Sequence, residues 1–291
     1  MKMTISPSLA KDAGLALSRE IAALFLEWGA TVFVDEKTGA FYQGLPVVCA
    51  EQNRCFEGAD FAISVGGDGT FLKTAHLATP HGVPVLGVNK GTVGFLTEVE
   101  PDELHELRRL LTGEFKIEQR MMLQARVRRG RRTPYTGVAV NDISVHRGAS
   151  TRLLHVQVAS DGSFIHRYRG DGIIVSTPTG STAYALSAGG PIIDPRSNCI
   201  EVVPVAAHTL GIRPTIFHSN ARITVTPLIE EGRDATLLAD GAAGFLLLPG
   251  DVVHIRRDRT PVLVVRMKPD SFYEVVRSKL QEGEGHEAQT T

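Results

Sequence analysis

The pattern of apolar residues changes near residue 117, and this change constrains the fold more than any other feature of the 291-residue chain. Before it, short apolar runs at 31–34 and 61–65 are separated by stretches with helical spacing. After it, apolar and polar residues alternate at every second position, as at 123–127 and 252–256. Helices between strands predict a parallel sheet covered by helices, whereas a period of two predicts strands with one buried face. We therefore expect an α/β domain with a parallel sheet, followed by a β-rich domain.

The length fits this division, because 291 residues is about twice the usual size of a single domain. We place the α/β domain at 1–116 and the β-rich domain at 117–270. Residues 271–280 have the spacing of a closing helix that returns to the first domain, and the polar tail that follows, up to residue 291, is expected to be disordered. The opening segment, residues 1–7, is short for a complete first strand.

Composition excludes several classes of protein. The 31 basic and 32 acidic side chains leave a net charge of -1, so no overall field attracts nucleic acid or an anionic membrane. A basic turn at 128–132 has no interleaved aromatic residues, and we expect no nucleic-acid partner. No apolar run approaches the ~18 residues of a membrane span, and the N-terminus lacks the apolar core of a secretory signal. The sequence therefore predicts a cytoplasmic protein that does not bind membranes.

The first of three glycine-rich clusters is Gly66-Gly67-Asp68-Gly69-Thr70, between a buried strand and a helix. Glycines let the backbone turn sharply and approach a ligand, and the helix N-terminus offers unpaired N–H groups to phosphate. A carboxylate among phosphates suits phosphoryl transfer, where the attacking hydroxyl must be positioned and its proton accepted. The alternative is an ordinary strand-to-helix turn with Asp68 as the helix cap.

The second cluster, residues 89–96, again follows a strand and reads Asn-Lys-Gly-Thr-Val-Gly-Phe-Leu. Its glycines predict a loop at the carboxyl edge of the sheet, where open α/β folds bind ligands. Phe95 and Leu96 would form an apolar wall for a base.

The third cluster, residues 171–184, reads Asp-Gly-Ile-Ile-Val-Ser-Thr-Pro-Thr-Gly-Ser-Thr-Ala-Tyr. A strand leads into a loop rich in hydroxyls and then into a helix expected near Ser181, and Tyr184 is suited to stacking on a planar base. A capped helix after a polar turn explains the hydroxyls equally well, but not the length of the run. Asn141-Asp142, at the start of a strand, adds an amide and a carboxylate that suit a base edge or ribose hydroxyls, although such a pair also occurs in ordinary turns.

These four motifs, in this order and at these separations, resemble those of the bacterial and archaeal NAD kinases. The resemblance continues through His208-Thr-Leu210, Asp240-Gly241 and the closing segment 272–280, and is weakest in the first sixty residues. It implies a Rossmann-like first domain and a β-rich domain that supplies most of the NAD site.

The resemblance also implies an activity: transfer of the terminal phosphate of ATP, or of polyphosphate, to the 2′-hydroxyl of the adenosine ribose of NAD. The product is NADP, and a divalent cation, expected to be Mg²⁺, takes part, with no metal ligands assigned. Asp68 would accept the proton of the hydroxyl, the glycines beside it would bring main-chain donors to phosphates, and Lys73 would supply positive charge.

Two departures from the family pattern concern the NAD side. Asp142 stands where many relatives have glutamate, and Ala242 stands where some have a glutamine that touches NAD. Arg152 and Arg169 fall where the family often contacts NAD, although each also fits a solvated strand residue. The residues expected to bind the nucleotides are Gly66, Gly67, Gly69, Thr70, Lys73, Asn89, Phe95, Asn141, Asp142, Arg152, Arg169, Asp171, Thr179, Thr182, Ala183, Tyr184, Ala185, Leu186 and Ser187.

The resemblance further implies a homodimer or homotetramer, because related enzymes complete each NAD site with a neighbouring subunit. Two other functions stay open. A lipid or sugar kinase would share the first glycine cluster but would leave the third unexplained. A catalytically silent nucleotide sensor would keep the pocket, although retention of Asp68 argues against it.

Overall fold

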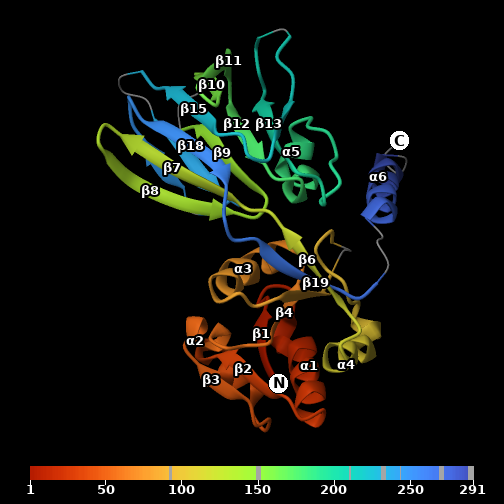
Figure 1. Ribbon diagram of the computed structural model, residues 1–291. Coiled ribbons are helices and arrows are strands. Elements are labelled where there is room, and N and C mark those ends of the chain that lie inside the picture. Colours follow the sequence, from red (N-terminus) through yellow and green to blue (C-terminus); the bar gives the residue numbers. More distant parts are fainter. Residues whose placement is uncertain are drawn as a thin grey trace. The chain divides into compact units, whose positions relative to one another are not determined.

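The computed structural model describes residues 1–291 except 92–93, 149–151, 210, 231–233, 243, 269–271 and 288–291. The chain forms two compact units (Figure 1). Unit 1 comprises Met1–Gln119 and Val262–Thr291, and unit 2 comprises Arg120–Pro261. Parts of four predicted segments lie outside the described residues: Thr92 and Val93, Leu210, Ser271 and the end of the tail, 288–291.

Unit 1 is built on a seven-stranded sheet in the order β3-β2-β1-β4-β5-β19-β6. All pairings recorded from β3 across to β19 are parallel, as the alternation of strands and helices predicts. The strands are β1 (Lys2–Pro7), β2 (Thr31–Asp35), β3 (Val48–Ala50), β4 (Phe61–Gly66), β5 (Val85–Asn89), β6 (Lys116–Arg120) and β19 (Val262–Arg266). The helices are α1 (Ala16–Glu27), α2 (Gln52–Phe56), α3 (Asp68–Ala78), α4 (Arg109–Thr112) and α6 (Phe272–Glu287), with 3-10 turns η1 (Ala13–Leu15), η2 (Glu36–Tyr42), η3 (Thr79–His81) and η4 (Pro101–Arg108).

The first strand differs from its sequence-based expectation. β1 is a complete strand of six residues in the interior of the sheet, paired with β2 on one side and β4 on the other. Met3, Thr4 and Ile5 are buried, so both faces of the strand are covered. Its central place matters because the loop after β1 reaches the same edge of the sheet as the loops after β4 and β5.

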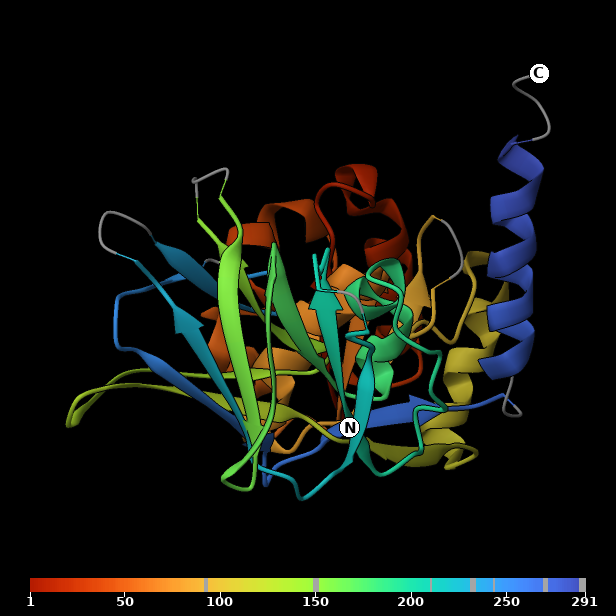
Figure 2. The ribbon, with the colours of Figure 1, turned by 90° about the horizontal axis from the view of Figure 1, so that it is seen from above.

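Helical segments cover the sheet of unit 1. Leu17, Ile21 and Phe25 of α1 are fully or almost fully buried in its core, while Leu24 and Trp28, predicted on the same face, pack at its margin. The helix predicted at 101–111 is a 3-10 segment, η4, followed by the short α4. α6 is one helix that continues to Glu287, beyond the end expected near residue 280 (Figure 2). The chain re-enters unit 1 at Val262, earlier than the predicted boundary at 271, because β19 pairs with β5.

Unit 2 is a sandwich of two six-stranded sheets, ordered β11-β10-β15-β18-β7-β8 and β14-β13-β12-β9-β16-β17. Its core takes residues from both sheets, such as Val127, Val156 and Val225 from the first and Val145, Val175 and Leu237 from the second. The first sheet contains β7 (Leu123–Arg129), β8 (Arg132–Ala139), β10 (Leu154–Ser160), β11 (Ser163–Gly170), β15 (Ile223–Leu228) and β18 (Val252–Arg257). The second contains β9 (Asp142–Arg147), β12 (Gly172–Ser176), β13 (Cys199–Val205), β14 (Thr215–His218), β16 (Ala235–Ala239) and β17 (Phe245–Leu247). The fold class predicted from the change of period, an α/β unit and a β-rich unit, is confirmed.

Candidate functional site

The first two glycine clusters meet at one edge of the unit 1 sheet. β1, β4 and β5 are adjacent and parallel, so the loops that follow them leave from the same edge. Gly66 ends β4, and Asn89 ends β5 and pairs with it in register. We call Gly66 to Thr70 the phosphate cradle.

The cradle needs glycine where the chain passes close to its neighbours. A β-carbon at Gly66 would lie 2.4 Å from the Thr70 hydroxyl oxygen and 3.0 Å from the Ser8 β-carbon. A β-carbon at Gly69 would meet nothing within 4 Å, so the backbone there faces open space. The N-cap of α3 is Gly67, without a side-chain cap, and Asp68 is the first helical residue. The interpretation of Asp68 as the helix cap is therefore wrong.

The Asp68 carboxylate instead joins the first glycine cluster to the second. Its Oδ2 accepts a hydrogen bond of 3.0 Å from the Phe95 N–H, and its Oδ1 accepts one of 3.0 Å from the Leu96 N–H. A β-carbon at Gly94 would lie 2.1 Å from that Oδ1. Gly94 thus permits the approach that fixes the carboxylate, a link that the sequence did not reveal.

The structure brings a different lysine to the cradle from the predicted one. Lys73 is exposed and lies five residues after Asp68 in α3. Five residues turn an α-helix by about 140° beyond one full turn, so the two side chains leave α3 on different faces. Lys11, in the loop after β1, has its Nζ 2.6 Å from the position of a β-carbon at Gly67 and 3.7 Å from one at Gly91. Among the residues described, the Lys11 ammonium makes no hydrogen bond or ion pair. A cation thus lies over both glycine loops.

The loop that carries Lys11 is held by its neighbour Asp12, which is 1% exposed. The Asp12 carboxylate accepts hydrogen bonds from the N–H groups of Leu17 and Ser18, at 3.0 and 2.9 Å, and from the Ser18 hydroxyl at 2.6 Å. The signal in the sequence is a lysine four residues after the end of the first strand, and it has this meaning only if 1–7 is a complete strand.

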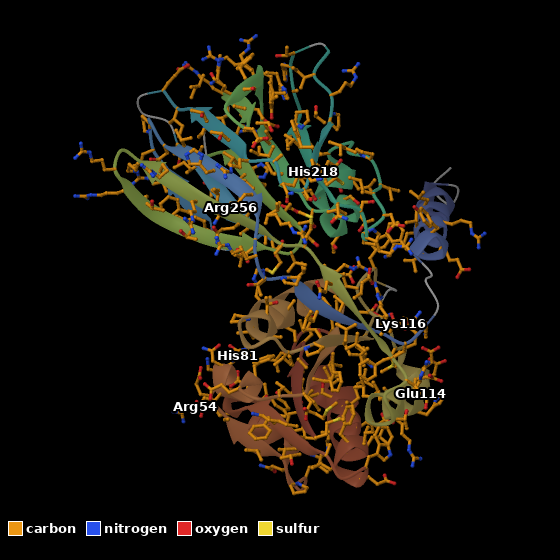
Figure 3. All side chains as sticks on the ribbon, in the orientation of Figure 1. Arg54, His81, Glu114, Lys116, His218 and Arg256 are labelled. Carbon is orange, nitrogen blue, oxygen red and sulfur yellow. The ribbon has the colours of Figure 1, made fainter. Side chains whose placement is uncertain are left out.

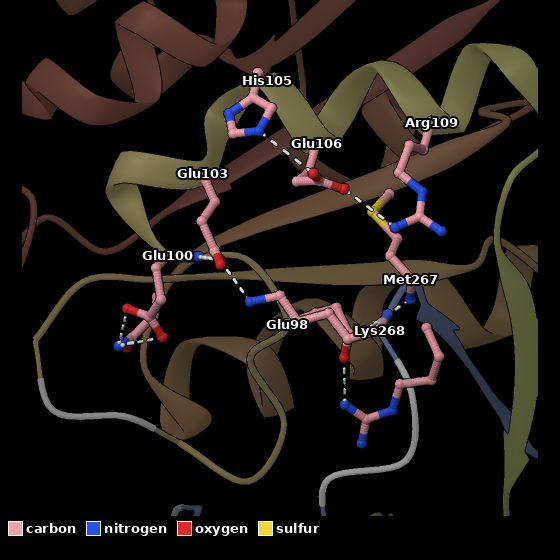
Figure 4. A network of polar contacts seen from close by, with 10 residues as sticks. Glu98, Glu100, Glu103, His105, Glu106, Arg109, Met267 and Lys268 are labelled. Carbon is pink, nitrogen blue, oxygen red and sulfur yellow. Dashed lines mark hydrogen bonds and ion pairs between the residues drawn. The ribbon is translucent and has the colours of Figure 1, made fainter.

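Asn89 is a structural support of the second loop. It is 1% exposed, and its Nδ2 donates to Glu100 Oε2 at 2.9 Å and to the Gly91 carbonyl at 3.2 Å. Its Oδ1 is buried without a partner among the described residues. Figure 4 shows the Glu100 contact within a wider polar network of unit 1.

The same network fastens the segment beyond Phe95. Glu98 accepts hydrogen bonds of 2.7 Å from Arg266 Nη1 and from the N–H groups of Met267 and Lys268 (Figure 4). The Phe95 ring, predicted as a wall for a base, lies 6.2 Å from the Phe272 ring of α6, and the Lys279 ammonium lies 5.2 Å from its centroid. One face of that ring is thus already engaged by α6.

In unit 2, Asn141 and Asp142 lie at the start of β9, on a turn built by Asp240. The Asp240 carboxylate accepts hydrogen bonds from the N–H groups of Val140 and Asn141, both 2.7 Å, and of Asp142, 3.1 Å. A β-carbon at Gly180 would lie 2.3 Å from the Asn141 carbonyl, so the 179–182 turn packs directly on this pair. Asn141 Oδ1 is buried and has no partner in the described part of the chain.

Asp142 is 5% exposed. Burial, with a smaller contribution from the charge of Asp240, raises the pKa of Asp142 to about 7. Near neutral pH this carboxyl group is therefore present in both forms, and its protonated form can donate a hydrogen bond.

Tyr184 gathers several of the predicted residues around it. Burial and then the charges of Asp142 and Asp171 raise the pKa of its phenol, which places both carboxylates near the ring. The imidazole of His146 packs against the Tyr184 ring at 5.5 Å and 34°. Arg147 Nε donates to Asp171 Oδ1 at 2.6 Å. His146 and Arg147 were missed, although His146 shares a strand face with Asp142 at a spacing of four residues.

The two predicted arginines are both exposed. Arg169 is exposed on β11, and its carbonyl accepts the His208 N–H at 2.8 Å. Arg152 is exposed and follows residues outside the described set. The arginine that the structure pairs with Asp171 is Arg147, which was not predicted from the sequence.

The 179–187 segment is a broken helix rather than the continuous one expected from Ser181. A non-helical Ala183 (φ −103°, ψ −125°) separates η5 (Thr179–Thr182) from α5 (Tyr184–Ser187). Thr179 and Ala185 are buried, whereas Thr182, Ala183, Tyr184, Leu186 and Ser187 are at least partly accessible. The Ser181 hydroxyl is used internally, donating to the Pro178 carbonyl at 2.7 Å and accepting the Ile193 N–H at 3.0 Å.

Comparisons with known proteins agree with the motifs. Residues 15–115 match the model of the ATP-NAD kinase N-terminal domain, and residues 140–267 match that of the ATP-NAD kinase C-terminal domain. The NAD kinase of Moorella thermoacetica is 43% identical over 226 residues, 77% of this chain and 72% of that protein. The NAD kinase of Caldanaerobacter subterraneus subsp. tengcongensis is 35% identical over 282 residues, 97% of this chain and 99% of that protein.

The chain belongs to the NAD kinase family. The resemblance stated from four motifs is thus confirmed, and with it a family of phosphotransferases. A lipid or sugar kinase is not favoured by these relatives.

Solved structures of the family share the fold. Yeast NADH kinase complexed with NADH superposes with a TM-score of 0.88 at 23% identity, over 96% of this chain and 87% of that one. An NAD kinase from Archaeoglobus fulgidus in complex with ATP superposes with a TM-score of 0.72 at 25% identity, over 97% and 99% of the two chains.

Two further observations concern metal ligands and membrane-spanning helices. Within the described residues, no group of three or more His, Cys, Asp or Glu side chains is arranged to hold a metal ion. Nor does any described helix have the length and apolar character needed to cross a bilayer.

Proposed function

We propose that the chain phosphorylates the 2′-hydroxyl of the adenosine ribose of NAD with the terminal phosphate of ATP and releases NADP. The observation that carries this proposal is the position of Asp68, a carboxylate fixed by two backbone N–H groups within a glycine cradle. Family membership supplies the substrate class, and polyphosphate stays a second donor to test.

In this proposal Asp68 accepts the proton of the ribose hydroxyl. Each carboxylate oxygen has two lone-pair directions and uses one on the Phe95 or Leu96 N–H, so one direction on each oxygen is left for the substrate. Two hydrogen bonds fix the orientation of the carboxylate before the substrate arrives, which lowers the reorganisation needed during transfer.

The donor phosphates would bind at the cradle, through main-chain N–H groups at Gly66, Gly67 and Gly69. α3 is eleven residues long, and the positive end of its dipole points to this loop. Lys11 adds a full positive charge over Gly67. Together these groups would stabilise the charge that spreads over the phosphoryl oxygens in the transition state.

A divalent cation, expected to be Mg²⁺, would neutralise phosphate charge in the same step. Since the described side chains offer no three-ligand cluster, such an ion would be held mainly by the phosphates of the nucleotide, as is common for Mg²⁺. In this proposal the ion would lie near the Asp68 carboxylate and near Gly69, where the backbone faces open space.

The unit 2 residues would bind the NAD nucleosides. Asn141, whose buried amide oxygen has no partner among the described residues, and Asp142, able to donate or accept, suit hydroxyl and amide groups of the dinucleotide. Tyr184, backed by His146, offers an aromatic face for a base. Completion of this site by a neighbouring subunit, in a homodimer or homotetramer, belongs to the proposal.

The test is an assay of the purified protein with ATP, Mg²⁺ and NAD, scored for NADP with a dehydrogenase that accepts only NADP. We expect NADP from the parent chain and a fall in kcat of about 10²–10⁴-fold in Asp68→Asn, with the affinity for NAD measured separately by calorimetry. Asp102→Asn, an exposed carboxylate in η4, is the matched control. Absence of NADP from the parent would refute the function, and full turnover by Asp68→Asn would refute the role of Asp68.

A further inference from the structure

A groove rich in arginine lies on the outer face of the first sheet of unit 2. Along β7, Ala125 and Val127 point into the core, and the alternate positions Arg126 and Arg128 point outward. The groove has a volume of about 350 Å³ and is lined by Arg126, Arg128, Arg222, Arg256, His254 and Gln124, among others. Figure 3 labels Arg256 on β18.

The groove spans neighbouring strands. His254 of β18 is directly opposite Arg126 of β7, and Arg256 is opposite Gln124. Paired positions on adjacent strands lie about 5 Å apart, and alternate positions along one strand about 7 Å apart. The side chains that carry the guanidinium groups are therefore attached to closely spaced positions of one sheet.

The arginine side chains of the groove have no acidic partner among the described residues. Among the residues that the structure describes, the side chains of Arg126, Arg128 and Arg222 form no ion pair or hydrogen bond. Arg256 Nη2 donates at 3.2 Å to the neutral Gln124 amide oxygen, and Gln124 Nε2 donates at 3.0 Å to Asp258. Two acids border the groove: Asp258, which is engaged by Gln124, and Asp161, whose Oδ1 accepts the backbone N–H of Arg222 at 3.2 Å.

The cluster repels a further positive charge. Burial, and then the charge of Arg128, lower the pKa of His254, whose Nδ1 lies 3.3 Å from the Thr224 hydroxyl. Like charges on neighbouring strand positions destabilise a sheet. The net charge of the chain is -1, so four arginines whose side chains form no ion pair within the described residues are a local excess that an anion would neutralise.

The chemistry of the lining selects the kind of anion. Guanidinium groups match the geometry of phosphate oxygens and bind them with paired hydrogen bonds. The described lining residues include no Phe, Tyr or Trp on which a nucleobase would stack, and the side chain of their one apolar member, Ile255, is buried in the core. A volume near the lower end of small-molecule sites suits a short ligand rather than a polymer.

We propose that this groove is a binding site for a short linear oligophosphate, held by Arg126, Arg128, Arg222 and Arg256. It is formed by unit 2 residues alone and is distinct from the cradle of unit 1. The proposal does not depend on the function proposed above, because no residue of the groove is assigned to phosphoryl transfer.

The test is isothermal titration of the full chain with sodium triphosphate in buffer without Mg²⁺. The wild type is compared with Arg126→Ala/Arg222→Ala and with Arg167→Ala, a control arginine exposed on β11 of the same sheet and outside the groove. Triphosphate bound at the cradle contributes equally to all three proteins, so the difference reports the groove. We expect the double variant to lose one site per chain, or at least about tenfold in its affinity, while Arg167→Ala binds like the wild type.

Three results would overturn the proposal, each with folding checked by thermal melting. The first is an equal stoichiometry and affinity in all three proteins. The second is binding of orthophosphate as tight as that of triphosphate, which would show that a chain of phosphates is not recognised. The third is a groove that binds a single-stranded oligothymidylate more tightly than triphosphate, which would assign it to nucleic acid.

Discussion

Two aspartates, one in each unit, show how the same side chain is prepared for different work. Asp68 of unit 1 meets two backbone N–H donors in a glycine loop, and its position is fixed by those bonds. Asp142 of unit 2 is buried near a second carboxylate, Asp240, and its pKa is raised to about 7. Backbone donors orient a carboxylate, which suits the proton acceptor proposed at Asp68, whereas burial gives Asp142 a carboxyl group that can also carry a proton.

The supports of the two groups differ as well. Asp68 depends on glycines, because Gly94 leaves room for its oxygen and Gly66 for the turn. Asp142 depends on a strand and on the Asp240 turn that organises its backbone. Replacing a nearby glycine with alanine is therefore the most direct test of Asp68. Replacing the carboxylate with a neutral amide is the most direct test of Asp142.

The largest effect is expected from Gly94→Ala. The added carbon would lie 2.1 Å from Asp68 Oδ1, so the carboxylate must turn or the 94–97 loop must shift. We expect kcat to fall by about 100-fold, the scale of a misplaced catalytic group, while thermal unfolding shows a folded protein. Gly69→Ala is the contrasting variant, because its β-carbon meets nothing and lies in a helix, where alanine is favoured. Its melting temperature should not fall, and a kcat for Gly94→Ala equal to that of the parent would show that Asp68 needs no fixed position.

A smaller effect is expected from Lys11→Ala. Its ammonium lies over Gly67 and Gly91 without a described partner, so its loss should weaken the binding of donor phosphates. We expect the KM for ATP to rise about tenfold and the KM for NAD to stay within twofold, measured by initial rates. Lys37→Ala, an exposed lysine of η2, is the matched control. A rise in both KM values would assign Lys11 to general stability instead.

The smallest effect concerns stability and its pH dependence. The pKa of Asp142 is raised from 3.8 to about 7 in the folded chain, so between these values the folded state binds more protons than the unfolded state. Its contribution to the free energy of unfolding is then complete below pH ~4, falls as the pH rises towards 7, and is lost above it. Asp142→Asn should therefore melt at a higher temperature than the parent at pH 8, with the difference shrinking at pH 5.

Glu201 supplies the control for Asp142. It lies on the same row of the second sheet, since Ser176 pairs with both residues, and burial raises its pKa to about 7. Both Glu201 oxygens are buried without a described partner. Glu201→Gln should give the same shift in melting at pH 8, yet leave the KM for NAD unchanged, whereas Asp142→Asn should raise it. Equal effects of the two variants on NAD would remove Asp142 from the proposed site.

The class of each unit and the positions of the loops could be predicted from the order of residues alone. The spacing of apolar residues, every second position in a strand or every three to four in a helix, is set by which side chains are buried. Such spacing is visible within a short stretch of sequence. The glycine clusters were also readable, because only glycine permits those turns, and four motifs in order placed the chain in its family.

Which groups meet depends on the three-dimensional fold. The hydrogen bonds from Phe95 and Leu96 to Asp68 cross 27 and 28 residues of sequence, and no local pattern encodes them. Lys11 lies beside the cradle because a parallel sheet brings the ends of β1, β4 and β5 to one edge. Lys73 points away from Asp68 because it lies on another face of α3. In unit 2 the pairing of Arg147 with Asp171 likewise follows from strand register. Residue type and spacing specify what each segment can do, but the partners of a side chain are fixed by which strands lie next to one another.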